Sequence, residues 1–234
     1  MSRRRPPAAP DPQADLGPSQ GPIVLIGPMA AGKSHLAKYM ARRYGYGYAD
    51  SDSLIVQRHG QIPQLFEARG EDEFRRIEAE TIAELLEDES LDDSIISLGG
   101  GAPMTASVEA LLQHQMVAYL EIDERSVRRR LRRAGNRPML KGDPVQRWRD
   151  LMAQRRDTYE ALADIRLDAS GNRPISRIAE DLHEEIQALR RQVVTSMVLE
   201  SERLLARTRS RALLTHFTTD VRSYTRSQMA LMGL

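Results

Sequence analysis

Residues 27–34 read Gly-Pro-Met-Ala-Ala-Gly-Lys-Ser and satisfy the pattern Gly-x-x-x-x-Gly-Lys-Ser. Glycines let a backbone turn so that several N–H groups point into one concavity, where they hold phosphate oxygens. The lysine supplies a mobile charge for the outer phosphates, and the serine hydroxyl is a ligand for Mg²⁺. An apolar run at 23–26 precedes the pattern and an amphipathic stretch follows it, which is the strand–loop–helix setting that the pattern needs. The sequence therefore predicts binding of a nucleoside triphosphate.

Two acids separated by one residue, Asp50 and Asp52, follow the next apolar run. At the carboxyl end of a parallel strand beside a phosphate loop, one acid faces a metal and its waters. The other faces the pocket for an acceptor hydroxyl, which it orients and from which it accepts a proton during phosphoryl transfer. The alternative is that Asp50 or Asp52 simply caps the following helix.

Two further patterns suggest close contacts around an acceptor. Arg75 and Glu78 are three residues apart in a charged helical segment, so they share a face, and a preset arginine clamps a substrate carboxylate well. The alternative is a solvated ion pair. Gly99-Gly100-Gly101 follows the third apolar run, and such a costly run makes sense where something approaches the main chain closely. An ordinary flexible loop is its alternative.

Composition limits the possible classes of protein. The 234 residues are 41% hydrophobic, enough for one α/β domain with appendages or for two small domains. A formal net charge of +1 argues against bulk electrostatic binding to nucleic acid or to a membrane. The absence of cysteine excludes disulfides and thiolate metal sites and fits a reducing compartment, so a cytoplasmic location is expected. No apolar run reaches the roughly 20 residues that span a bilayer.

The chain divides into three parts. Residues 1–20 are rich in proline and are expected to be disordered, residues 21–190 alternate short apolar runs with helical patterns, and residues 191–234 form a basic helical extension. The alternation predicts a five-stranded parallel sheet flanked by helices. Strands are expected at 22–26, 46–49, 94–98, 117–120 and 165–167. Helices are expected at 33–44, 52–59, 62–67, 71–87, 105–114, 124–132, 144–162 and 175–190. The extension is interpreted as a helix packed on the domain or a tail, with contact to a partner as the alternative.

Taken together, these motifs resemble those of the shikimate kinase family over residues 21–190. The phosphate loop, Asp-x-Asp, Phe-Arg-x-x-Glu at 74–78 and the triple glycine occur in the family's order and spacing. Residues 136–140, Asn-Arg-Pro-Met-Leu, resemble its lid segment, and Arg155 with Tyr159 matches its Arg-x-x-x-Tyr helix.

The resemblance implies a three-layer P-loop kinase fold with a mobile lid. It also implies transfer of the γ-phosphoryl group of ATP to the 3-hydroxyl of shikimate, giving 3-phosphoshikimate for chorismate and aromatic amino-acid biosynthesis. Mg²⁺ would be the cofactor, held by Ser34 and by Asp50 directly or through water. Asp52 would act as the base toward the 3-hydroxyl, while Lys33 and Arg137 neutralise charge on the transferring group. ATP and shikimate are the expected partners of a monomeric protein.

Two sets of binding residues follow from the resemblance. The ATP-binding set is Gly27, Pro28, Met29, Ala30, Ala31, Gly32, Lys33, Ser34, His35, Arg137 and Arg173. The shikimate-binding set is Asp52, Arg75, Glu78, Gly99, Gly100, Gly101 and Arg155. Asn172 is the alternative to Arg173 at the adenine end. Most arginines of the 128–133 stretch are expected to lie on a solvated helix face.

The chain departs from the family at Ala30, where glycine is usual; we expect tolerance, because the turn needs its outer glycines most. Three other functions remain open. The first is a kinase for another small hydroxy acid such as gluconate, which has no need of both Arg75 and Arg155. The second is a nucleotide-sensing regulator that binds ATP without turnover. The third is a module that binds nucleotide for stability only.

Overall fold

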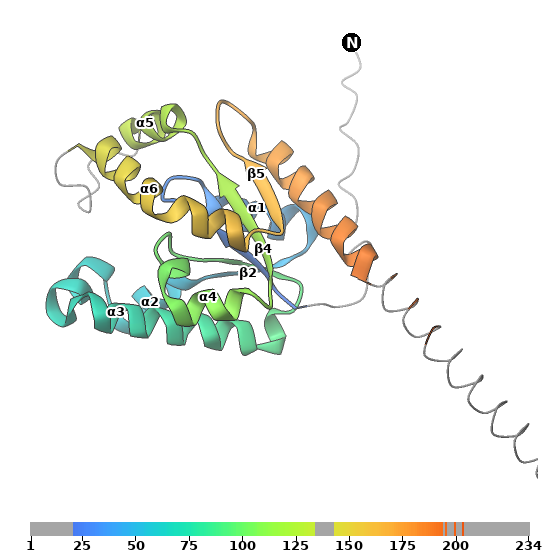
Figure 1. Ribbon diagram of the computed structural model, residues 1–234, viewed down its shortest axis with the longest axis horizontal. Coiled ribbons are helices and arrows are strands. Elements are labelled where there is room, and N and C mark those ends of the chain that lie inside the picture. The colour runs from blue at the N-terminus through green and yellow to red at the C-terminus, as the bar shows by residue number, and fades with distance from the viewer. Residues whose placement is uncertain (1–20, 134–142, 194, 196–198, 200–202, 204–234) are drawn as a thin grey trace, which may run out of the picture. The chain divides into compact units, whose positions relative to one another are not determined.

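A five-stranded parallel sheet organises the chain, in the order β2-β3-β1-β4-β5 (Figure 1). The computed structural model describes residues 21–133 and 143–193, together with 195, 199 and 203. The strands are β1 (Ile23–Ile26), β2 (Gly47–Asp50), β3 (Ser94–Ser97), β4 (Met116–Glu121) and β5 (Ile165–Asp168). Each predicted strand is confirmed, because it overlaps an observed strand whose ends differ by no more than one residue.

The burial of each strand agrees with its position in the sheet. Every residue of β1 and β3 is buried, as expected for apolar, β-branched strands covered on both faces. In contrast, β2 is partly exposed and β5 alternates between buried and exposed residues, which suits the two edges of the sheet. Pairing of Leu25 with Ser97 and with Ala118 brings the carboxyl ends of β1, β3 and β4 to one edge. The loops after these strands therefore meet there.

Helices lie on both faces of the sheet (Figure 1). They are α1 (Lys33–Tyr44), α2 (Ser51–His59), α3 (Ile62–Glu87), α4 (Ala106–Leu112), α5 (Glu124–Arg133) and α6 (Pro144–Leu162), and residues 175–193 are also helical. Two short 3₁₀ turns are η1 (Glu89–Leu91) and η2 (Ala102–Met104). α1 packs against β1, β2 and β3, whereas α6 packs against β4. The three-layer architecture predicted from the alternating pattern is thus present.

The long helix α3 is interrupted where the sequence predicts a break. Gly70 has φ 81° and ψ 173°, which are not helical, and it separates the two predicted helices 62–67 and 71–87. On either side of the break, Leu65, Phe74 and Ile77 pack with Ile55 of α2 in one buried cluster. This cluster fixes the part of α3 that carries Arg75 and Glu78.

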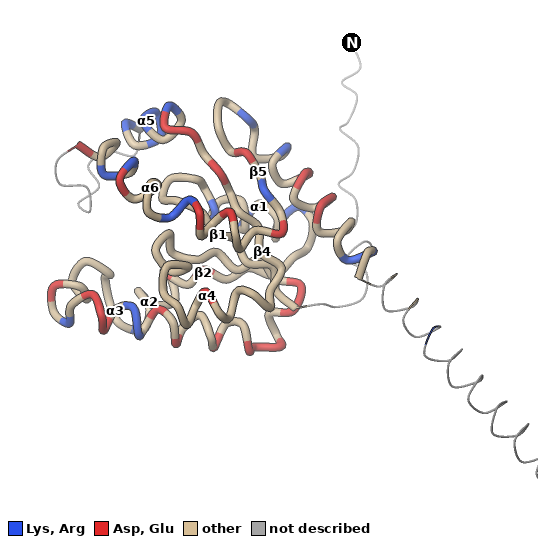
Figure 2. Tube along the Cα trace, viewed as in Figure 1, with Lys and Arg blue, Asp and Glu red and all other residues tan. Residues whose placement is uncertain are grey.

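The chain divides into two compact units, with the boundary in the sequence between Ile186 and Gln187. In the first, residues 175–186 bury Ile178, Ala179 and Leu182. In the second, the helical residues 187–193 continue the chain, and Val193 is exposed. The predicted disordered N-terminus, the lid and most of the extension lie outside the described residues. Many of the residues of α5 are arginines (Figure 2). No helix in the described ranges is long and apolar enough to cross a membrane.

Candidate functional site

The phosphate loop, residues 27–32, connects β1 to α1 and needs glycine at both of its outer positions. Gly27 has φ 134° and Gly32 has φ 101°, in the region that L side chains rarely adopt. A Cβ at Gly27 would also come within 2.6 Å of the Leu120 carbonyl oxygen. Ala30 itself has φ 65°. The chain tolerates an alanine there in a left-handed conformation that glycine adopts with less strain.

Lys33, the first residue of α1, is buried beneath this loop. Its Nζ donates hydrogen bonds to the carbonyl oxygens of Gly27 at 2.7 Å and of Pro28 at 3.2 Å. Burial lowers the pKa of Lys33 to about 8, although the negative charges of Asp52 and Asp50 oppose the shift. The ammonium group is therefore held at the loop by neutral carbonyl oxygens, and a bound phosphate would give it a charged partner there.

Ser34 and Asp50 form a pair of oxygen donors at the entrance of α1. The Ser34 hydroxyl donates a hydrogen bond to Asp50 Oδ2 at 2.6 Å. The Ser97 hydroxyl oxygen lies 3.3 Å from the Ser34 hydroxyl oxygen. Asp50 Oδ1 accepts a hydrogen bond from the Ser53 backbone N–H at 2.9 Å. Asp50 therefore caps α2 with one carboxylate oxygen and contacts Ser34 with the other. Burial opposes ionisation of Asp50, but these hydroxyl and backbone donors outweigh it and lower the pKa.

This pair fits Mg²⁺, which prefers oxygen ligands and takes most of the rest from waters and nucleotide phosphates. A site made only of protein ligands would need more donors than Ser34 and Asp50. No group of three or more His, Cys, Asp or Glu side chains suited to a metal occurs among the described residues.

Asp52 lies one residue into α2 and close to Lys33. Burial raises the pKa of its carboxyl group, the neighbouring charge of Asp50 raises it further, and Lys33 and Arg75 act in the opposite direction. A carboxylate with a raised pKa is a better proton acceptor than an ordinary surface aspartate. The pKa values of the two acids are therefore shifted in opposite directions: hydrogen bonds lower that of Asp50, and burial raises that of Asp52.

The triple glycine is a place of close approach between main chain and charged side chains. A Cβ at Gly99 would lie 2.7 Å from Asp52 Oδ1 and 2.8 Å from Glu78 Oε1. At Gly101 it would lie 2.7 Å from both terminal nitrogens of Arg75. Side chains at these positions would displace the acidic and basic groups, so the loop is not simply flexible.

Arg75 and Glu78 form a largely buried ion pair rather than a solvated one. Arg75 Nη1 lies 2.6 Å from Glu78 Oε2, and the exposed fractions of the two side chains are 24% and 2%. Burial raises the pKa of Glu78, while Arg75 lowers it. Because Glu78 holds one edge of the guanidinium, the other donors of Arg75 keep a preset direction.

Arg155 reaches the same loop from α6. Its Nη1 donates to the carbonyl oxygen of Gly100 at 3.1 Å, and the Tyr159 hydroxyl donates to this oxygen as well. Arginines from α3 and α6 thus approach the triple glycine at Gly101 and Gly100 respectively.

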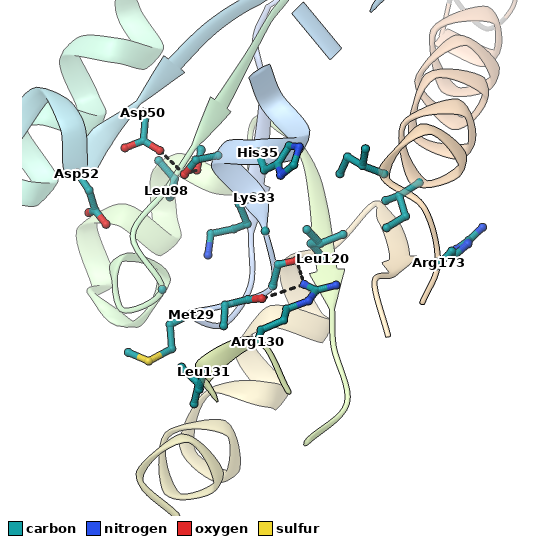
Figure 3. A pocket seen from close by; sticks show the side chains of 18 residues that line it. Met29, Lys33, His35, Asp50, Asp52, Leu98, Leu120, Arg130, Leu131 and Arg173 are labelled. Carbon is teal, nitrogen blue, oxygen red and sulfur yellow. Dashed lines mark hydrogen bonds between the residues drawn. The ribbon is translucent and has the colours of Figure 1, made fainter. Parts of the chain in front are cut away.

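A cavity of about 560 Å³ opens over the phosphate loop (Figure 3). It is lined by Met29 to His35 of the predicted ATP-binding set, and by Asp50, Asp52, Gly100 and Arg173. Gly27 and Pro28 do not line it, but their carbonyl groups hold Lys33. Arg75, Glu78, Gly99, Gly101 and Arg155 lie around the glycine run, outside the cavity lining. Asp52 and Gly100 of the predicted shikimate-binding set therefore also line the cavity over the phosphate loop.

Arg130 of α5 is a cavity residue that sequence reasoning placed on a solvated face. Its Nη1 donates to the carbonyl oxygens of Ala30 at 2.9 Å and Ala31 at 2.7 Å, and its Nη2 donates to that of Ala169 at 2.7 Å. A usable signal was present, because Arg130 is three residues after the buried Val127 and shares its helix face.

The adenine end of the cavity has one candidate from the predicted pair. Arg173 lines the cavity and Asn172 does not. The Arg173 guanidinium is engaged by the Asp168 carbonyl oxygen at 3.0 Å and by the Asp181 carboxylate. Arg137, predicted in both the catalytic and the ATP-binding sets, lies outside the described residues.

A parallel sheet with a phosphate loop after β1 and an acid at the end of β2 defines a P-loop small-molecule kinase. The family model described as "Shikimate kinase" matches residues 29–194. This chain belongs to the shikimate kinase family.

Individual relatives agree. The shikimate kinase of Streptomyces coelicolor is 38% identical over 153 residues, which cover 65% of this chain and 88% of that protein. The shikimate kinase of Corynebacterium efficiens is 36% identical over 69% of this chain and 94% of its own. Among solved structures, shikimate kinase from Acinetobacter baumannii in complex with shikimate has a TM-score of 0.60, 31% identity, and coverage of 75% of this chain and 94% of that one.

The fold extends beyond this family. A gluconokinase from Sinorhizobium meliloti has a TM-score of 0.54 at 18% identity, covering 75% of this chain and 97% of that one. At this identity the likeness concerns the fold alone.

Proposed function

We propose that the protein transfers the γ-phosphoryl group of ATP to the 3-hydroxyl of shikimate, giving ADP and 3-phosphoshikimate. One observation carries the proposal: Asp52 joins the nucleotide cavity to the glycine loop, which two arginines approach from separate helices. Shikimate bears one carboxylate and several hydroxyl groups, so it needs a cationic clamp at one end and a carboxylate base at the other.

The proposed steps use groups already in place. Asp52 accepts the proton of the acceptor hydroxyl as its oxygen bonds to the γ-phosphorus, while the bond to the leaving oxygen of ADP breaks in line. Lys33 leaves the carbonyl oxygens of Gly27 and Pro28 and pairs with the phosphates. Ser34 and Asp50 would hold Mg²⁺, which supplies charge neutralisation on the phosphates. Catalysis then comes mostly from positioning and electrostatics.

Arg75 and Arg155 would bind the shikimate carboxylate. Loss of a charge-assisted clamp costs about 2–5 kcal/mol, which raises the acceptor KM by one to several powers of ten. Replacement of Asp52 should instead reduce turnover with nucleotide binding retained.

The first test is a coupled ADP-release assay with Mg-ATP and shikimate, gluconate, quinate or no acceptor. Release only with shikimate supports the proposal, and release with gluconate would assign another acceptor. Nucleotide binding without acceptor-dependent release would favour the regulator. Asp52→Asn, Arg75→Ala and Arg155→Ala follow, and a normal acceptor KM in either arginine variant would contradict the assignment of the clamp.

Cytoplasmic location and a monomeric state stay predictions. Light scattering coupled to size-exclusion chromatography tests the second.

A further inference from the structure

Two donors on α6 share one acceptor in the glycine loop. Arg155 and Tyr159 are four residues apart and so lie on one face of the helix. The Tyr159 hydroxyl and Arg155 Nη1 both donate to the Gly100 carbonyl oxygen. A carbonyl oxygen has two lone pairs, so the two donors saturate it.

Gly100 lies where the phosphate loop meets the acceptor residues. Its Cβ position would be 3.3 Å from the Gly27 carbonyl oxygen and 3.4 Å from the Met29 backbone nitrogen. Its neighbours on either side, Gly99 and Gly101, approach Asp52, Glu78 and Arg75. A shift of the Gly100 peptide would therefore move the groups that surround the acceptor.

Tyr159 is held by packing as well as by its hydroxyl. Its ring stacks on that of Tyr119 in β4, with centroids 5.3 Å apart, and both side chains are almost fully buried. The Tyr119 hydroxyl is also buried but has no hydrogen-bond partner among the described residues. The two stacked tyrosines thus differ in what their hydroxyl groups do.

We propose that Tyr159 is a positioning residue for the phosphoryl acceptor. The Tyr159 hydroxyl holds the Gly100 carbonyl group in place, so that Arg155 donates only one hydrogen bond to it. The remaining N–H donors of Arg155 stay directed at the acceptor carboxylate. Without this hydroxyl, one lone pair of Gly100 is left unsatisfied in a partly buried site, and Arg155 turns toward it. The inference rests on the proposed function, because it concerns binding of the carboxylate-bearing acceptor.

The test compares two identical chemical changes at neighbouring rings, Tyr159→Phe and Tyr119→Phe. Removing the Tyr159 hydroxyl should raise the shikimate KM about three- to tenfold, the loss expected for one hydrogen bond. The turnover number and the KM for ATP should change less than twofold. Tyr119→Phe should leave all three constants within twofold of the wild type, because that hydroxyl makes no hydrogen bond to any described residue. Calorimetric titration with shikimate gives the same comparison without turnover.

A cycle with Arg155→Ala tests the route of the effect. If Tyr159 acts through Arg155, then Tyr159→Phe changes the shikimate KM less than twofold in the Arg155→Ala background. An unchanged shikimate KM in Tyr159→Phe overturns the inference, as does an additive cycle. A fall in Tm of more than about 10 °C, with the turnover number and both KM values impaired to the same degree, would show a purely structural role for Tyr159 and would also overturn the inference. Failure of wild-type protein to phosphorylate shikimate would instead refute the proposed function.

Discussion

Nucleotide binding should become coupled to proton uptake above pH 8. In the free protein, burial lowers the pKa of Lys33 to about 8. A nucleotide phosphate next to Nζ favours the ammonium form and raises this pKa again. Above pH 8, the free protein has lost the Lys33 proton and must take one up to bind, whereas below pH 8 it already holds that proton.

The size of the effect follows from the shift. One pKa unit corresponds to about 1.4 kcal/mol, so affinity should fall about tenfold for each pH unit above 8, until the pKa of the complex is reached. Although nucleotide affinity falls above pH 8, titration of Lys33 should make the free protein more stable as the pH rises. Between pH 8 and the ordinary lysine pKa of 10.5, the unfolded chain retains a proton that the folded chain has lost. The Lys33 contribution to the free energy of unfolding therefore rises with pH across this window, by at most about 3 kcal/mol.

Isothermal titration of Mg²⁺ and a non-hydrolysable ATP analogue, from pH 7 to 9.5, measures this directly. Two buffers of different ionisation enthalpy at pH 8.5 count the protons taken up, and most of one proton is expected. Lys33→Arg should lose the pH dependence, because arginine stays charged throughout. Lys38→Met, which removes an exposed lysine of the same helix, should keep it. Constant affinity with no proton uptake in the wild type would refute the argument.

Three further outcomes are expected from single substitutions. Glu78→Gln should raise the shikimate KM about tenfold and also lower Tm, because Arg75 loses its charge partner in a largely buried ion pair; a fall in Tm with an unchanged KM would contradict the predicted role in acceptor binding. Ala30→Gly should raise the free energy of unfolding by about 0.5–1 kcal/mol in urea denaturation, because φ 65° strains alanine and the greater entropy of unfolded glycine offsets only part of the gain; a lower midpoint would count against it. Gly101→Ala should fold normally by circular dichroism but raise the shikimate KM, because the new methyl group displaces the flexible end of Arg75; wild-type kinetics would be the contrary result.

The elements could be predicted because local sequence determines them strongly. The apolar run of β1 is fully buried, and α1 ends at Gly45, whose left-handed φ of 80° only glycine adopts readily. The break in α3 follows from Gly70 for a similar reason. Where periodicity was clear, as in α6, both helix ends were predicted to the residue.

The contacts between elements could be predicted only in part. Spacing placed Asp50 and Asp52 near the phosphate loop, because parallel strands end at one edge, and the family resemblance added Arg75 to the same site. Spacing did not reveal that Asp50 both caps α2 and bonds Ser34, since one residue can satisfy two neighbours. Nor did it separate Arg130 from the other arginines of α5, because its three carbonyl partners come from distant parts of the chain.

We propose that the glycine run contributes to acceptor recognition within a widely shared fold. Gly99, Gly100 and Gly101 are not among the described residues with positive φ, so backbone conformation does not require glycine at these positions. Space does, because charged side chains from α2 and α3 and the backbone of the phosphate loop come within 3.4 Å of their Cβ positions. The loop has no side chains at these three positions because large charged side chains occupy the space beside it. Since the sheet and phosphate loop alone do not select an acceptor, we infer that selection depends on the charged side chains for which these glycines leave room.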